Sequence, residues 1–233
     1  MDSLHIEIDG ISIEVLRKPI KNMHLRIYPP DGRVRLSAPL KLSLKHIYQQ
    51  IEAKREWLHT QRARVQALPP TLPPLLQNGE QHYFLGEPYT LALIEHQSSF
   101  KVNLCKNVLQ LSTKRDSTLH QKQAILKQWH QTQIQSLVPA LIQKWQPIMN
   151  VNVTAWGAKI MKTRWGSCNV RTRRIWLNLL LIKKPIQCLE YVLVHEMVHL
   201  LEASHNKRFH QLMDQFMPEW RIHKETLNLP MNT

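Results

Sequence analysis

The chain has 233 residues, 43% of them hydrophobic, which suits one large domain or two small ones with a buried core. Its three cysteines form no Cys-x-x-Cys pair, which argues against a disulfide framework or a cysteine-based zinc ribbon and favours a reducing, cytoplasmic setting. The first residues do not resemble a signal peptide, and no run approaches the roughly 18 apolar residues of a membrane helix. We therefore expect a soluble, unexported protein with no membrane segment.

The formal net charge of +14 is large for this length and unevenly distributed. No Asp or Glu occurs from Ser117 to Leu189, whereas eleven Lys and Arg residues lie between Lys122 and Lys184. Such an excess attracts anionic partners, such as nucleic acid, an acidic protein or a phospholipid surface. The alternative is a solvated basic face that has no ligand.

The first part of the chain is predicted to contain hairpin strands and one helix. Apolar and polar residues alternate through the first forty positions, with turns at Asp9-Gly10 and at residues 29–32. The apolar spacing becomes helical over residues 43–65, and Ser43 is a suitable N-cap. Four prolines within residues 68–79 then predict a linker. We therefore expect a first domain over residues 1–78 and a second over residues 79–233.

The second part is predicted to begin with further short strands, in hairpins rather than in a parallel sheet, between residues 82 and 113. A long helix is expected over residues 119–145, and extended chain over residues 151–182. Lys184-Pro185 then opens another helix, since proline suits the first helical turn. This order of elements indicates an α+β protein with a β-rich hairpin region at its N-terminus.

The predicted helix around residues 191–201 carries three polar side chains in an otherwise apolar sequence: His195, Glu196 and His199. Buried without partners, each would cost a few kcal/mol, so the fold must supply hydrogen bonds or a metal. Residues four apart share a helix face, so both imidazoles can bind one Zn²⁺, while Glu196 is rotated towards a water molecule as general base. The alternative is a pair of core histidines bonded to backbone carbonyls.

A catalytic zinc commonly takes three protein ligands, so one more is required. His205 can face the metal only if the chain turns near residues 203–204, after which Asn206 would cap a helix ending before Pro218. Glu202 and Asp214 are the alternative ligands, and Cys168 is a weaker candidate because a thiolate can also bind zinc.

Four segments of the chain together resemble the YgjP-like family of zinc metallopeptidases. They are KTRWGSC (162–168), RIWLNLLLIKKP (174–185), YVLVHEMVHLLEASHNKRF (191–209) and MPEW (217–220). The resemblance implies His195, His199 and His205 as ligands and Glu196 as the catalytic base. It also implies a zincin-like metallopeptidase domain over residues 79–233, related to the SprT and WLM proteases, with its core motifs within residues 153–226.

The segment before the metal helix has two interpretations. In zincins an edge strand binds extended substrate through its main chain, which makes Gly166 and Ser167 candidate substrate-binding residues. The alternative is that the neighbouring Trp165 and Cys168 simply pack the sheet against that helix.

The leading functional hypothesis is therefore a zinc-dependent metallopeptidase acting on polypeptides by water activation, with Glu196 as general base. A second hypothesis is a nucleic-acid-associated zinc protein, either a DNA-guided protease or a binding module, that uses the basic segment of residues 117–189. A third is a metal-dependent hydrolase of a non-peptide bond, because the motif specifies the water chemistry more closely than the scissile bond.

Overall fold

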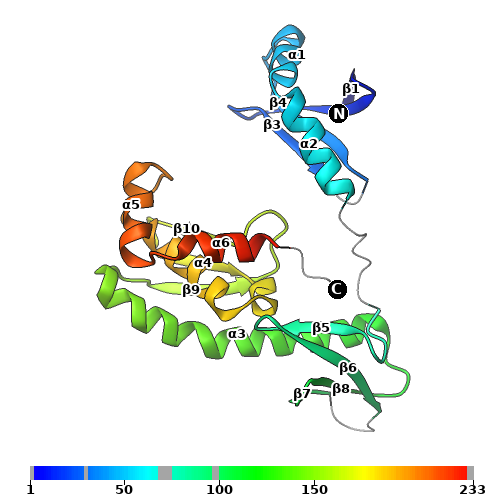
Figure 1. The fold of residues 1–233 in the computed structure, drawn as a ribbon, viewed down its shortest axis with the longest axis vertical. Coiled ribbons are helices and arrows are strands. Elements are labelled where there is room, and N and C mark those ends of the chain that lie inside the picture. The colour runs from blue at the N-terminus through cyan, green and yellow to red at the C-terminus, as the bar shows by residue number, and fades with distance from the viewer. Residues whose placement is uncertain (1–2, 29–30, 68–74, 96–99, 230–233) are drawn as a thin grey trace. The chain divides into compact units, whose positions relative to one another are not determined.

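The structure is a computed structural model that describes residues 3–28, 31–67, 75–95 and 100–229 (Figure 1). It confirms an α+β protein with strands at the N-terminus and most of the helices in the C-terminal region. The chain forms two compact units, residues 1–73 and 74–233. Most of the predicted proline-rich linker, residues 68–74, lies outside the described residues.

Unit 1 is a four-stranded sheet of order β1-β2-β4-β3, with two helices packed against it. Its elements are β1 (Ser3–Ile8), β2 (Ile11–Lys18), β3 (His24–Tyr28), β4 (Arg33–Pro39), α1 (Leu44–Glu52) and α2 (Arg55–Gln66). The two predicted hairpins form, and Asp9 and Gly10 take the positive φ angles that a tight two-residue turn needs. The inner strands β2 and β4 pair in parallel, which alternation alone did not indicate.

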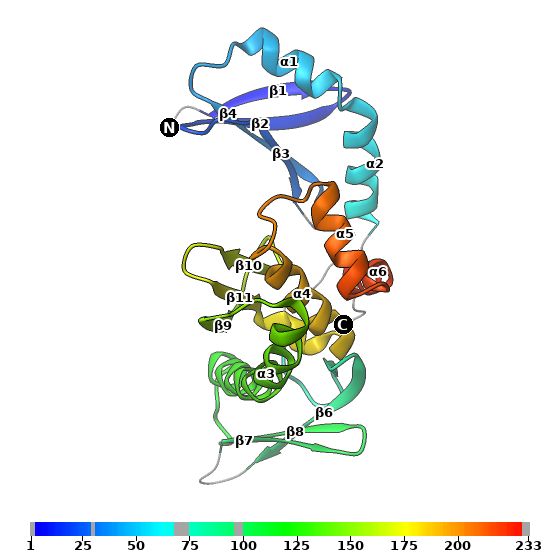
Figure 2. The same cartoon turned by 90° about the vertical axis from the view of Figure 1, so that its left-hand side faces the viewer.

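The single helix predicted over residues 43–65 is in fact two helices. Ser43 caps α1 as expected, with its hydroxyl accepting the His46 N–H at 3.3 Å. The helix ends at Glu52, and α2 starts in a new direction (Figure 2). This break lets both helices reach the same core, α1 through Ile47 and Ile51 and α2 through Leu58.

Unit 2 begins with a second sheet of the same connectivity, order β5-β6-β8-β7. Its strands are β5 (Gln81–Phe84), β6 (Glu87–Glu95), β7 (Lys101–Cys105) and β8 (Val108–Thr113). The expected hairpins are present, but β6 and β8 again pair in parallel, so the prediction of hairpins without parallel pairing was incomplete.

The remainder of unit 2 surrounds the largest core. The helix α3 (Leu119–Met149) extends four residues past its predicted end and is followed by a three-stranded sheet of order β10-β11-β9. The other elements are β9 (Ala155–Lys159), β10 (Gly166–Asn169), β11 (Arg174–Asn178), η1 (Leu179–Lys183), α4 (Ile186–Val198), α5 (Lys207–Phe216) and α6 (Trp220–Asn228). Buried side chains of α3, β11, η1, α4, α5 and α6 form most of this core.

One predicted extended segment is wrong, because residues 179–183 form the short 3-10 helix η1. The Asn178 side chain accepts the Leu180 N–H at 3.2 Å and so caps it. Leu179, Leu181 and Ile182 are all buried, and a compact turn points consecutive apolar side chains inward where a strand would alternate them.

Among the described residues, no helix is both long and apolar enough to cross a membrane.

Candidate metal centre

The helix α4 is buried along most of its length, as its apolar sequence predicted. It begins after Pro185 and ends at Val198, with His199 as its C-cap. The last turn tightens, with the N–H groups of Leu200 and Leu201 bonded to carbonyls three residues earlier. The chain therefore leaves the helix four residues before the turn predicted near residue 203, and this early exit brings the following loop back over α4.

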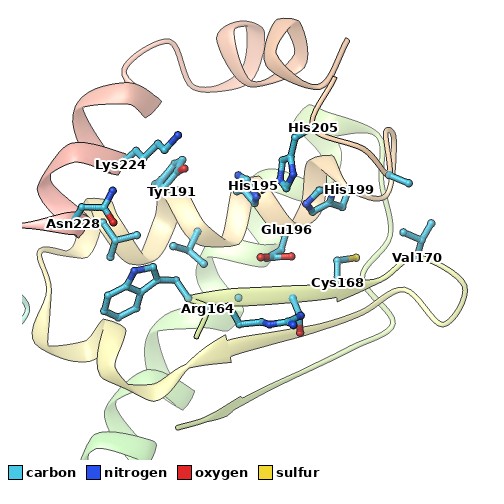
Figure 3. Close-up of a pocket in the computed structure, with 16 residues that line it drawn as sticks. Arg164, Cys168, Val170, Tyr191, His195, Glu196, His199, His205, Lys224 and Asn228 are labelled. Carbon is cyan, nitrogen blue, oxygen red and sulfur yellow. Dashed lines mark hydrogen bonds between the residues drawn. The ribbon is translucent and has the colours of Figure 1, made fainter. Parts of the chain in front are cut away.

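That loop places His205 against the two helical histidines. One ring-nitrogen atom from each of His195, His199 and His205 lies within 4.8 Å of the other two, and the Nε2 atoms of His195 and His205 are 2.9 Å apart (Figure 3). The Nδ1 atom of His199 donates to the Glu202 carbonyl at 3.2 Å, which leaves its Nε2 lone pair for another partner. The loop and the helix thus bring three imidazoles to one point.

The Phe209 ring packs against all three imidazoles, and the sequence analysis did not identify it as part of the site. Its ring centroid lies 4.9 Å from those of His195 and His199 and 4.6 Å from that of His205. Asn206 caps α5 as predicted, accepting the Phe209 N–H at 3.0 Å. The cap therefore fixes the first turn of α5 and, with it, the aromatic side chain that holds the three imidazoles in place.

Electrostatics favour the neutral form of His195 and His205. Burial, reinforced by the neighbouring His199 and His205, lowers the pKa of His195 to about 3. Burial also lowers the pKa of His205, with His199 as the next cause. Neutral imidazoles offer lone pairs, and three converging nitrogens are a donor set that suits zinc. The residues present therefore fit a metal ion.

The alternative ligands lie outside this group of described residues. The side chain of Glu202 accepts the Ser204 N–H at 3.2 Å, and Asp214 accepts the indole N–H of Trp220 at 2.8 Å. Cys168 lines the same cavity, but burial and then the charge of Glu196 raise the pKa of its thiol to about 11. Cys188 is fully buried in the core.

Glu196 lies between the histidines and strand β10 (Figure 3). It is only 5% exposed, and burial raises its pKa to about 8, with Arg164 acting in the opposite direction. A cation bound by the adjacent histidines would lower this pKa by favouring the carboxylate. The Gly166 backbone passes so close that a Cβ atom there would stand 2.6 Å from the Glu196 Oε1 atom.

The cluster opens into a cavity of about 520 Å³ between α4, β10 and α6. Glu196 is the only acidic residue in its lining, whereas Arg164 and Lys224 contribute positive charge. Gly166 and Ser167 also line it, from a strand that pairs only with β11 among the described strands. Trp165 and Cys168 pack against the core, so the packing interpretation holds for these two residues.

A family model covers most of the chain. The YgjP-like, metallopeptidase domain matches residues 21–229 of the chain. The chain belongs to the YgjP-like family. This confirms the resemblance of its sequence motifs, and the match extends over both compact units. No curated protein and no solved structure matches the chain. Family membership identifies a metallopeptidase-like hydrolase and implies a metal ion.

Proposed function

We propose that this YgjP-like chain is a zinc-dependent metallopeptidase that hydrolyses peptide bonds. His195, His199 and His205 are the proposed ligands, and Glu196 is the proposed general base. The observation that carries the proposal is the convergence of three imidazoles beside a buried carboxylate in an open cavity. Zinc in such a site polarises a carbonyl and lowers the pKa of water.

The chain's own residues then handle the proton and the substrate. Glu196 takes a proton from the attacking water and passes it to the leaving amine, while the wall formed by Gly166 keeps its carboxylate in place. The edge of β10 that pairs with no described strand offers main-chain groups to an extended polypeptide, which supports the proposed role of Gly166 and Ser167. The three free cysteines support the proposed cytoplasmic setting.

The test compares wild type with Glu196→Gln on a broad peptide library and on a panel of ester and phosphate-ester substrates. Because loss of a general base lowers the rate by about a hundredfold or more, we expect a fall of that size in Glu196→Gln. The substitution should leave the zinc stoichiometry and the melting temperature unchanged. Glu219→Gln, which alters an exposed carboxylate outside the cavity lining, is the matched control and keeps full activity.

Two results would contradict the proposal in different ways. Undiminished hydrolysis by Glu196→Gln would remove Glu196 as the base. Zinc-dependent hydrolysis of an ester or phosphate ester, with every peptide left intact, would retain the metal site but establish the non-peptide hydrolase.

A second function, association with nucleic acid, has one structural observation in its favour. The basic residues of segment 117–189 include a group on the β9–β10–β11 sheet, on the face opposite to α4.

A further inference from the structure

The outer face of the β9–β10–β11 sheet carries a tryptophan between two cations. Ile175 and Leu177 of β11 are fully buried against the core, so the alternating residues Arg174 and Trp176 project from the other face. The Lys159 Nζ atom lies 4.2 Å from the Trp176 ring centroid, and the Arg174 guanidinium carbon lies 4.8 Å from it. We call Lys159, Arg174 and Trp176 the cationic sheet face.

The neighbouring strand β9 has a glycine where the Trp176 ring lies. Gly157 of β9 is the register partner of Trp176, and a Cβ atom at Gly157 would stand 2.6 Å from Trp176 Cζ3. The indole therefore lies across the β9 backbone instead of entering the core. Trp176 remains partly exposed, unlike the core tryptophans Trp145 and Trp220.

Three further cations lie in the loops that connect the strands of this sheet, and side-chain hydrogen bonds hold these loops. The buried Asn178 amide donates to the carbonyls of Met161 and Arg164 at 2.9 and 3.0 Å, and Asn169 accepts the Thr172 N–H at 3.0 Å. The cations presented by these loops are Lys162, Arg171 and Arg173, whereas Arg164 lines the metal cavity.

These charges are not paired with acidic side chains of the described residues. All five cations are exposed, and none takes part in an ion pair there. No acidic residue occurs in the whole segment that supplies them. Five like charges on and beside one small sheet repel one another, and a polyanion would relieve that repulsion.

We propose that the cationic sheet face binds single-stranded nucleic acid. The cations would contact phosphates, and bases would stack on the indole of Trp176 or on the planar guanidinium of Arg174. In a duplex the base faces are already stacked on one another and cannot stack on a side chain. An acidic polypeptide has no bases to stack on the indole. Lys159, Arg174 and Trp176 do not line the metal cavity, so the proposal stands apart from the proposed hydrolysis.

The experiment measures binding of the full chain to fluorescent dT20 by anisotropy across a salt series. For single strands, each phosphate contact adds about 0.7 to the magnitude of the slope of log binding constant against log salt concentration. The double variant Lys159→Ala with Arg174→Ala should therefore reduce the magnitude of this slope by about 1.4. The matched control, Lys101→Ala with Lys127→Ala, removes the same charge from exposed positions elsewhere in unit 2 and leaves the slope unchanged.

The tryptophan is tested separately from the charges. Loss of one stacked base lowers affinity by about fivefold or more, so Trp176→Leu weakens binding without changing the salt slope, whereas Trp176→Phe retains most of the affinity. Thermal melts verify that each variant is folded. If Trp176→Leu is unfolded, the proposal is judged from the affinity of Trp176→Phe and the salt slopes of the charge variants.

Several results would overturn the proposal. One is that the chain does not bind dT20, and another is that the two double variants lose affinity equally. A third is that a duplex binds as tightly as dT20 and Trp176→Leu has no effect. Competition by poly-glutamate as effective as that by dT20 would instead indicate an acidic protein partner.

Discussion

Gly166 and Glu196 illustrate how closely single residues determine the proposed centre. The carboxylate is buried, and the β10 backbone forms the wall on one side of it. A methyl group at position 166 would overlap both Oε1 and Cγ of Glu196, at 2.6 and 2.8 Å. The glutamate would then have to move, because the strand is fixed by its pairing with β11.

Gly166→Ala is therefore expected to reduce activity more than stability. A displacement of a catalytic group by about 1 Å can cost on the order of a hundredfold in rate, and we expect a fall of that size in kcat/KM with zinc content retained. Thr163→Ala, at an exposed position outside the cavity lining, is the control and should preserve activity. Wild-type activity in Gly166→Ala would show that Glu196 tolerates a shift or is not the base.

At the scale of elements, the position of α4 depends on its contact with α3. Glu190 of α4 accepts the Trp145 indole N–H at 2.7 Å and a hydrogen bond from Lys144 at 2.8 Å. The indole is 7% exposed, so its N–H depends on this acceptor, whereas the half-exposed Lys144 adds little. One carboxylate thus joins the long helix to the helix that carries His195 and His199.

Glu190→Leu should destabilise unit 2 because it leaves the indole N–H buried without an acceptor. The expected cost is about 1–3 kcal/mol in the free energy of unfolding, measured by urea denaturation. Glu190→Gln keeps a side-chain oxygen in place and should lower the free energy of unfolding much less. Equal losses in the two variants would show that charge, and not the hydrogen bond to Trp145, is what matters.

At the scale of the whole molecule, the hydrophobic cores separate along the chain. One core uses residues between Ile6 and Leu58, and the other two use residues between Leu76 and Leu227. We propose two domains divided within the proline-rich segment. The predicted division lies between residues 78 and 79, whereas Leu76 packs in a core of the second unit. Each should unfold as its own cooperative unit, because each has its own core.

Zinc should raise only one of the two expected thermal transitions in calorimetry, that of unit 2. A ligand at a hundredfold excess over its Kd stabilises the folded state by about 2.7 kcal/mol. His205→Ala should abolish this rise, whereas Asp214→Ala should preserve it. A rise in both transitions would contradict independent domains, and a rise retained in His205→Ala would contradict the ligand assignment.

The sequence by itself determined the features that depend on near neighbours in the chain. The spacing of His195, Glu196 and His199 on a buried helix, the caps Ser43 and Asn206 and the hairpins all follow from local periodicity and turn chemistry. The tertiary structure decided what depends on distant residues: the parallel pairing of β2 with β4, the helical form of residues 179–183 and the contact between Gly166 and Glu196. Periodicity shows which face of an element is apolar, but only packing selects the element that it meets.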